Sequence, residues 1–206
     1  MERGLLIAVE GCDKSGKDTQ IDEIAKRFLL DGEDVITIDF PVYDTPSGQA
    51  IRAILDGIHP LTTTDNPHEV QALYAINRYE QQTRIETALM QGKVVICNRY
   101  LHSAVVYGTF NGISDNWFYQ IQHSLVQPDL VVLLDIDYDE YLKRCKNYEE
   151  LDAYESDDTI IQYAINKYRQ LAEEHEWIMI DGKGSIEDIS ELIYRNLKMH
   201  MENMEV

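Results

Sequence analysis

Short apolar runs alternate along the chain with longer segments in which apolar residues recur every three or four positions. Short apolar runs are typical of strands buried on both faces of a sheet, and the three-to-four spacing is typical of helices that cover it. The predicted strands are residues 5–9, 35–40, 94–97, 130–134 and 177–180. The predicted helices are residues 17–30, 45–55, 67–90, 101–126 with an interruption near Gly112, 138–146, 158–174 and 185–200.

Residues that begin or end helices and strands support several of these boundaries. Gly32 closes the first predicted helix, and Pro41 stops the second strand. Before the long third helix, Asn66 is a capping residue, Pro67 suits the first helical position, and Glu69 completes a capping box. Strands that alternate with helices predict an α/β fold, with a five-stranded parallel sheet and helices on both of its faces.

Length and composition agree with one folded unit. The chain has 206 residues, of which 44% are hydrophobic and 27% charged, as is usual for globular proteins. No repeat, low-complexity tract or linker-like segment interrupts it. We therefore predict a single domain over residues 1–206.

Charge narrows the range of partners. Lys and Arg number 18 against 37 Asp and Glu, which gives a formal net charge of −19. Such a surface repels phosphodiester backbones and anionic membranes, so we expect neither a nucleic acid nor a membrane as partner. The apolar runs are also far shorter than a membrane span, and no signal peptide is visible. Three widely spaced cysteines (Cys12, Cys97 and Cys145) favour a reducing compartment, so we expect a cytoplasmic protein.

The first predicted strand leads directly into a phosphate-binding pattern, G-x-x-x-x-G-K. Glycines let the backbone wrap around a phosphate, the N–H groups point inward, and the lysine reaches the terminal phosphates. The strand–loop–helix context predicts an ATP site of the P-loop NTPase type. The pattern comprises Gly11, Cys12, Asp13, Lys14, Ser15, Gly16 and Lys17.

Asp18 stands where this pattern normally has the serine or threonine that ligates Mg²⁺. A carboxylate can also ligate Mg²⁺, directly or through water, and Thr19 follows as a substitute hydroxyl. The extra negative charge near ATP is unfavourable unless the metal compensates for it. Asp18 therefore keeps open the reading of a nucleotide-binding protein that has lost its activity.

Motifs along residues 5–195, taken together with this loop, resemble the thymidylate kinases among the nucleoside monophosphate kinases. They comprise Gly11–Gln20, Phe40-Pro41, Asn77-Arg78-Tyr79-Glu80-Gln81, Asn98-Arg99-Tyr100 with Ser103, Pro128–Leu134, Lys143-Arg144 and Tyr154-Glu155. The last two resemble the edges of a mobile lid, which we expect at about residues 145–158.

The resemblance implies roles for individual residues. Asp13 matches the loop carboxylate that accepts a hydrogen bond from the deoxyribose 3′-hydroxyl. Tyr74 matches the aromatic that stacks on thymine, and Arg78, four residues later on the same helix face, matches the arginine that contacts this base. Arg99 matches the arginine that grips the acceptor phosphate and the transferring group, and Arg144 matches the one that packs on adenine.

Further residues are expected around the substrate: Phe40, Tyr43, Asn77, Ser103 and Tyr107. Taken without the resemblance, Tyr74 is equally a core aromatic and Arg78 a surface helix residue paired with glutamates. Arg99 follows a parallel strand at the sheet edge where ligands bind, which favours a functional role.

Two further departures from the family pattern concern charge near the acceptor phosphate and the metal. Asn98 replaces an aspartate, and together with Asp18 it suggests an exchange of positions that conserves the charge of a magnesium site. Tyr43 stands where the family often has an arginine that holds the acceptor phosphate. We therefore expect Arg99 to take a larger share of that binding.

The predicted lid supplies no catalytic cation. Residues 147–158 contain six acidic residues and no Lys or Arg. Some members of the family take a catalytic arginine from the lid, and others take it from the phosphate loop, where this chain has Lys14. We therefore expect Lys14, with Lys17 and Arg99, to neutralise the transferring phosphoryl group.

The resemblance implies transfer of the ATP γ-phosphoryl group to dTMP, with Mg²⁺, in a homodimer. Two alternatives stay open: a kinase for another or modified pyrimidine deoxynucleoside monophosphate or deoxynucleoside, and a nucleotide-binding protein without catalysis.

Overall fold

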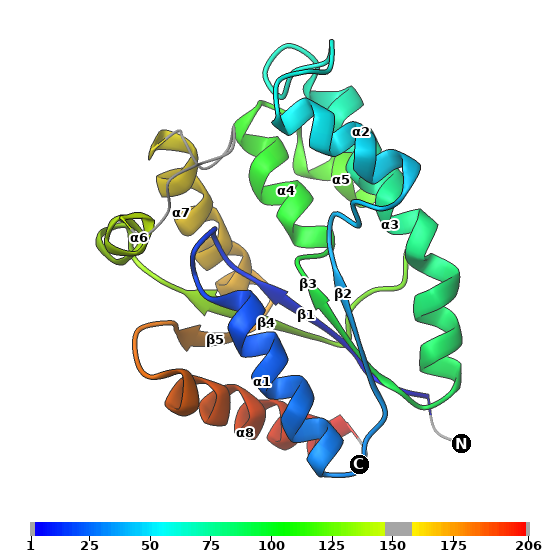
Figure 1. Cartoon of the computed structure of the whole chain (residues 1–206), viewed down its shortest axis with the longest axis vertical. Helices are drawn as coiled ribbons and strands as arrows, with labels where there is room; N and C mark the ends of the chain where they lie inside the picture. The colour runs from blue at the N-terminus through cyan, green and yellow to red at the C-terminus, as the bar shows by residue number, and fades with distance from the viewer. Residues whose placement is uncertain (1–2, 147–157, 205–206) are drawn as a thin grey trace.

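Five parallel strands form one sheet in the order β2-β3-β1-β4-β5 (Figure 1). The computed structural model describes residues 3–146 and 158–204. The strands are β1 (Leu6–Glu10), β2 (Val35–Asp39), β3 (Val94–Asn98), β4 (Leu130–Asp135) and β5 (Ile178–Asp181). The helices in these ranges are α1 (Lys17–Leu30), α2 (Pro46–Leu55), α3 (Pro67–Met90), α4 (Leu101–Phe110), α5 (Asp115–Ile121), α6 (Tyr138–Cys145), α7 (Asp158–Glu174) and α8 (Ile186–Met204). The predicted α/β architecture is confirmed.

Strand β1 shows how the two faces of the sheet are covered. Ile7 and Val9 pack with residues of α1 and α8, whereas Leu6 and Ala8 pack with residues of α3 and with the start of α4. Helix α7 lies beside α4 on this second side (Figure 1). Because side chains alternate along a strand, Glu10 points to the α4 and α7 side.

Two helix starts differ in how they are capped. Thr45 accepts a hydrogen bond from the N–H of Gly48 at 3.1 Å, and Pro46 occupies the first position of α2. At α3 the prediction of a side-chain cap is wrong, because the Asn66 side chain makes no cap bond. Its Oδ1 instead accepts from the N–H of Thr62 at 3.3 Å, in the preceding turn.

The single long helix expected over residues 101–126 is two shorter helices. The break falls at Gly112, as expected, where a φ of 82° turns the chain out of the helical path. Helix α5 ends at Ile121, five residues earlier than the predicted helix. Leu125 then lies buried with residues of α3 and β1, so the chain turns toward the sheet instead of continuing the helix.

The carboxyl ends of β1, β2 and β3 meet at one edge of the sheet. The phosphate-loop residues, the Phe40-Pro41 turn and Arg99 follow these three strands directly. Residues 147–157 of the predicted lid lie outside the described ranges. Within those ranges, no helix combines the length and the apolar character needed to cross a membrane.

Candidate active site

The loop between β1 and α1 has a backbone suited to an anion. Gly16 precedes α1 with a φ of 98°, and Gly11 has a φ of 149°. A Cβ at Gly11 would lie 2.6 Å from the carbonyl oxygen of Leu134, so no larger residue fits there without a shift of β4. The loop leads into the amino terminus of α1, whose first N–H groups have no partners within the helix and attract negative charge.

Lys17 lies at the centre of this loop and is buried. Its Nζ donates to the carbonyl oxygen of Cys12 at 2.8 Å and to Ser15 Oγ at 3.3 Å. Burial, reinforced by the charge of Arg99, lowers the pKa of Lys17 to about 8. A polyphosphate in the loop would restore the preference for the ammonium form. Burial also raises the pKa of the Cys12 thiol to about 12, so Cys12 contributes its carbonyl and not a thiolate.

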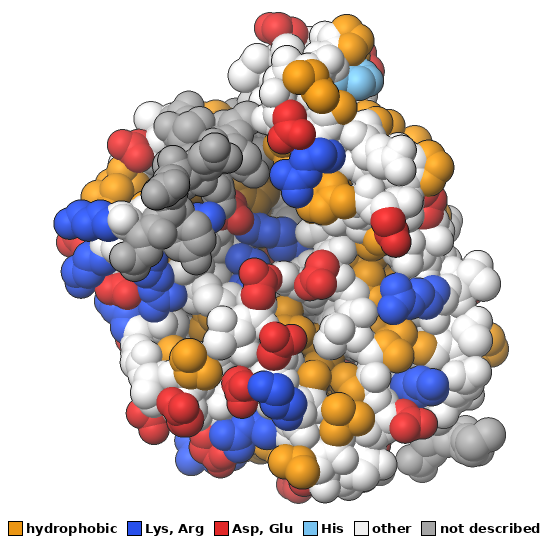
Figure 2. All heavy atoms as spheres, in the orientation of Figure 1, with side chains coloured by type: hydrophobic (Ala, Val, Ile, Leu, Met, Phe, Trp, Pro, Cys, Tyr) orange, Lys and Arg blue, Asp and Glu red, His pale blue; other side chains and the backbone are white. Residues whose placement is uncertain are grey.

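A cavity of about 490 Å³ opens beside the loop, between the sheet edge and helices α3 and α4. Figure 2 shows a hollow with Lys and Arg side chains in its depth and acidic side chains along its rim. The lining residues include Asp13, Asp18, Asp39, Phe40, Pro41, Tyr43, Gln71, Tyr74, Asn77, Arg78, Asn98, Arg99, Ser103 and Tyr107. All of the predicted substrate and metal residues are thus brought to one cavity.

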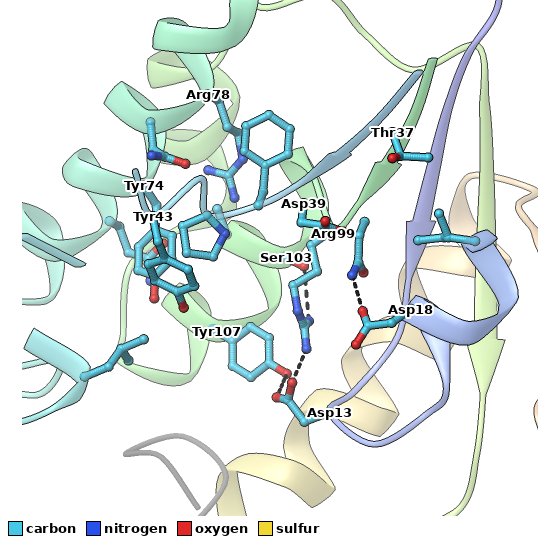
Figure 3. Close-up of a pocket in the computed structure, with 18 of the residues that line it drawn as sticks. Asp13, Asp18, Thr37, Asp39, Tyr43, Tyr74, Arg78, Arg99, Ser103 and Tyr107 are labelled. Carbon is cyan, nitrogen blue, oxygen red and sulfur yellow. Dashed lines mark hydrogen bonds and ion pairs between the residues drawn. The ribbon is translucent and has the colours of Figure 1, made fainter. Parts of the chain in front are cut away.

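Arg99 and Asp13 form an ion pair at the loop end of the cavity. Nη2 of Arg99 donates to Asp13 Oδ1, and Tyr107 donates from its hydroxyl to Asp13 Oδ2 at 3.1 Å (Figure 3). Nη1 of Arg99 also donates to the carbonyl oxygen of Gly11 at 3.1 Å. Burial acts to raise the pKa of Asp13, but Arg99, Lys17 and Tyr107 together hold it below its usual value. Asp13 is therefore an anion that can only accept hydrogen bonds.

Arg78 and Tyr74 lie at the opposite end of the cavity, both on α3 (Figure 3). The Arg78 side chain is buried, and within the described residues Nε and Nη1 have no hydrogen-bond partner. Burial lowers the pKa of Arg78, although the negative charge of Glu10 partly opposes this shift. Two unmatched N–H donors beside an aromatic ring suit a flat ligand that carries carbonyl oxygens.

Asn77 connects α3 to the turn after β2. Its Oδ1 accepts from the N–H of Val42 at 2.8 Å, and its Nδ2 donates to Val42 O, Thr45 Oγ1 and Ser47 Oγ. These bonds occupy the amide with protein partners and fix the turn against the cavity. Phe40 precedes this turn and is buried. Asn77 thus shapes the part of the cavity that Tyr43 lines. The guanidinium carbon of Arg52 lies 4.0 Å from the centre of the Tyr43 ring.

Asp18 and Asn98 are in direct contact. Nδ2 of Asn98 donates to Asp18 Oδ1, while Asn98 Oδ1 is buried with no partner among the described residues. Across residues 3–146 and 158–204 no cluster of three or more His, Cys, Asp or Glu could hold a metal without help. Mg²⁺, however, commonly takes one or two protein oxygens and completes its shell with phosphates and water. A carboxylate and a free amide oxygen beside a phosphate loop fit that requirement, whereas Thr19 does not line the cavity.

Arg144 lies against the outer side of the phosphate loop. It donates to the carbonyl oxygens of Lys14 at 3.1 Å, Ser15 at 2.8 Å and Gly182 at 2.7 Å, and Nε donates to Glu140 at 2.9 Å. Lys14 has a φ of 59°, in the left-handed region, and its carbonyl oxygen accepts from this guanidinium. The Arg144 guanidinium therefore binds the backbone carbonyls of the phosphate loop. The packing of Arg144 on adenine stays a prediction.

Sequence reasoning gave no role to several residues of the site, among them Gln71 in the cavity lining and two supporting residues, Glu10 and Tyr168. Glu10 and Tyr168 are both buried and hydrogen-bonded to Ser103, and Tyr168 also accepts from Arg99 at 3.2 Å. Glu10 could have been noticed in the sequence, because it is a charged residue at the end of a strand that is buried on both faces. Tyr168 fits the apolar pattern of its helix and gave no signal.

Fold and site together define a class of protein. A parallel sheet whose first strand ends in a phosphate loop, beside a cavity with cations at both ends, is the arrangement of a P-loop phosphotransferase that acts on a nucleotide.

The comparisons with known proteins identify the family within this class. The sequence model described as thymidylate kinase matches residues 9–193. The chain belongs to the thymidylate kinase family.

Curated relatives match almost from end to end. The chain is 34% identical to the probable thymidylate kinase of Pyrococcus horikoshii over 91% of its length and 92% of the relative. It is also 34% identical to the thymidylate kinase of Halothermothrix orenii, over 95% and 97% of the two chains. A solved thymidylate kinase from Candida albicans superimposes with a TM-score of 0.82 at 22% identity, covering 97% of this chain and 93% of that one, which supports the fold.

The Arg99–Asp13 pair predicts a pH-dependent contribution to stability. Asp13→Asn should lower the free energy of unfolding by about 1–3 kcal/mol at pH 7, because Arg99 loses its carboxylate. The pKa of Asp13 is lower in the folded than in the unfolded chain. Its stabilisation is therefore complete above about pH 4 and is lost as the pH falls through the folded-state pKa.

Urea unfolding of both proteins between pH 7 and pH 3 measures this contribution. The difference between wild type and Asp13→Asn should shrink at the acid end. Asp139→Asn, which changes an exposed carboxylate, is the matched control and should differ little from wild type at any pH. A difference for Asp13→Asn that stays constant over the whole range contradicts the assignment.

Proposed function

We propose that the protein transfers the γ-phosphoryl group of ATP to the 5′-phosphate of dTMP, giving dTDP and ADP. The observation that carries this proposal is the cavity itself. It joins a phosphate loop and Arg99 at one end to the unmatched donors of Arg78 and the ring of Tyr74 at the other. The names of the relatives, which match almost the whole chain, support the same substrates.

In the proposed reaction the protein positions the reactants and neutralises charge. Tyr74 and Arg78 hold the base, and the ionised carboxylate of Asp13 accepts from the 3′-hydroxyl of the sugar. An oxygen of the acceptor phosphate attacks the γ-phosphorus, the bond to the β–γ bridging oxygen breaks, and the electron pair leaves with ADP. Arg99 and Lys17 stabilise the charge that spreads over the transferring oxygens.

We also propose that Asp18 and Asn98 hold Mg²⁺ at the phosphates of ATP. A bound magnesium ion would supply charge neutralisation at the β- and γ-phosphate oxygens. Asp18 contributes the negative charge, and the free Oδ1 of Asn98 contributes a neutral oxygen. The homodimer that the family resemblance implies belongs to this proposal. So does a cytoplasmic location, to which the three unpaired cysteines lend support.

One assay separates this function from its rivals. Coupled ADP release with Mg-ATP should be measured with dTMP, dUMP, dCMP and thymidine as acceptors. We expect the highest kcat/KM with dTMP. Preference for another acceptor would favour the second kinase reading, and ATP binding without ADP release for any acceptor would favour a protein without catalysis.

The Asp18–Asn98 pair predicts a compensating double substitution. Asp18→Thr removes the carboxylate, and Asn98→Asp places two carboxylates in contact, so each change alone should lower turnover and raise the magnesium concentration needed for half-maximal rate. The double variant Asp18→Thr/Asn98→Asp restores one carboxylate and one neutral neighbour. It should therefore lose less activity than either single variant, and losses that simply add would contradict the exchange.

Lys14 is proposed as the loop cation of the transition state. Lys14→Ala should lower kcat about 100-fold or more, the scale expected for the loss of one charge partner of the transferring group. Lys26→Ala, an exposed lysine paired with Glu23 on α1, is the control and should keep normal turnover. Wild-type turnover in the Lys14→Ala enzyme would remove Lys14 from the mechanism.

A further inference from the structure

We infer that Glu10 and Tyr168 are positioning residues, which hold the backbone and the guanidinium of Arg99 in place for phosphoryl transfer. This inference rests on the proposed function. Glu10 is the last residue of β1 and is completely buried, with an exposed fraction of 0%. A carboxylate removed from water is tolerated only where several hydrogen bonds replace its hydration.

One oxygen of Glu10 holds the backbone around Arg99. Oε1 accepts from the N–H of Tyr100 at 2.9 Å and from the N–H of Ser103 at 3.3 Å, in the first turn of α4. Arg99 comes immediately before Tyr100, the N-cap residue of α4, and its φ of 59° is in the left-handed region that side chains disfavour. Glu10 thus replaces the missing side-chain cap of α4 and stabilises the strained peptide that directs Arg99 into the cavity.

The other oxygen of Glu10 acts on the guanidinium of Arg99 through two hydroxyls. Oε2 accepts from Ser103 Oγ at 2.6 Å and from Tyr168 OH at 3.2 Å, and these two hydroxyl oxygens are 2.8 Å apart. Nη1 of Arg99 donates to Tyr168 OH at 3.2 Å and to Ser103 Oγ at 3.4 Å.

The chemistry of the end groups gives this network one direction. Arg99 can only donate, so each of the two hydroxyls accepts from Arg99 and has its single O–H left to donate on the side of Glu10. Charge at one end polarises the hydrogen bonds along the chain and strengthens them. The inner side of the guanidinium is thereby fixed by Ser103 and Tyr168, while its outer side faces Asp13 and the cavity.

A guanidinium that is fixed before substrate arrives does not have to reorganise during the reaction.

Tyr168 is the member of the network that can be tested most cleanly, because Tyr168→Phe removes a single hydroxyl and keeps the buried ring. Tyr163→Phe is the matched control. It removes a hydroxyl from the same helix, one that donates to Thr109 Oγ1 at 2.9 Å.

We expect Tyr168→Phe to lower kcat/KM for dTMP about tenfold, the effect of one hydrogen bond to a charged group, while the KM for ATP stays within twofold. Tyr163→Phe should keep wild-type kinetics, although both variants should melt at a slightly lower temperature. A double-mutant cycle with Arg99→Lys separates positioning from a general loss of stability. Tyr168→Phe should cost less than twofold once Arg99 is changed.

Three outcomes decide the inference. Kinetics of Tyr168→Phe equal to those of Tyr163→Phe would overturn it, and so would a tenfold loss that persists in full in the Arg99→Lys background. If wild-type protein releases no ADP with any acceptor, the proposed function fails and this inference fails with it. In the first two cases wild-type turnover is normal, so the inference fails and the proposed function stands.

Discussion

The site is organised around a cation held between two carboxylates at the edge of the sheet. Arg99 pairs with Asp13 on the cavity side and reaches Glu10 through Ser103 and Tyr168 on the inner side. These partners come from the phosphate loop, β1, α4 and α7. A buried charge must be matched, so the relative placement of all four elements is constrained by this one guanidinium.

The negative net charge of the protein does not prevent a few cations from gathering at its site. A net charge of −19 describes the outer surface, which repels large polyanions. Arg78 and Arg99 line one partly enclosed cavity, and Lys17 is buried in the adjoining phosphate loop, so lower solvent screening makes each charge act more strongly. Two N–H donors of Arg78 are unmatched in the described structure, so a ligand with carbonyl oxygens would satisfy them and offset the free-energy cost of their burial.

Asp18 and Asn98 show how two departures from a family pattern can belong together. They are eighty positions apart in the chain but in direct contact, because Asn98 ends β3 on the face that α1 covers, and Asp18 lies in the first turn of α1. Considered separately, each substitution suggests a weakened metal site. Their contact supports the alternative that one carboxylate has exchanged positions with one neutral side chain.

Local patterns were sufficient for most of the fold. Apolar runs located all five strands to within one or two residues, and the phosphate loop followed from glycine spacing. Predictions that depended on packing were weaker. The Asn66 side chain bonds backward to Thr62, and the helix after Gly112 stops early because Leu125 is drawn into the core. Neither outcome is encoded in the residues next to it.

The sequence by itself determined the type of fold, the phosphate loop and the family resemblance, since each depends on short-range spacing or residue identity. Only the tertiary structure decided which side chains share a cavity and which support them. Asn77 matched a family motif, yet its amide is occupied by the turn at Val42 and shapes the site. Glu10 and Tyr168, 158 positions apart, meet only because β1 and α7 pack on the same side of the sheet. Burial and hydrogen bonding between distant segments are properties of the folded chain, and they assign these two residues to Arg99.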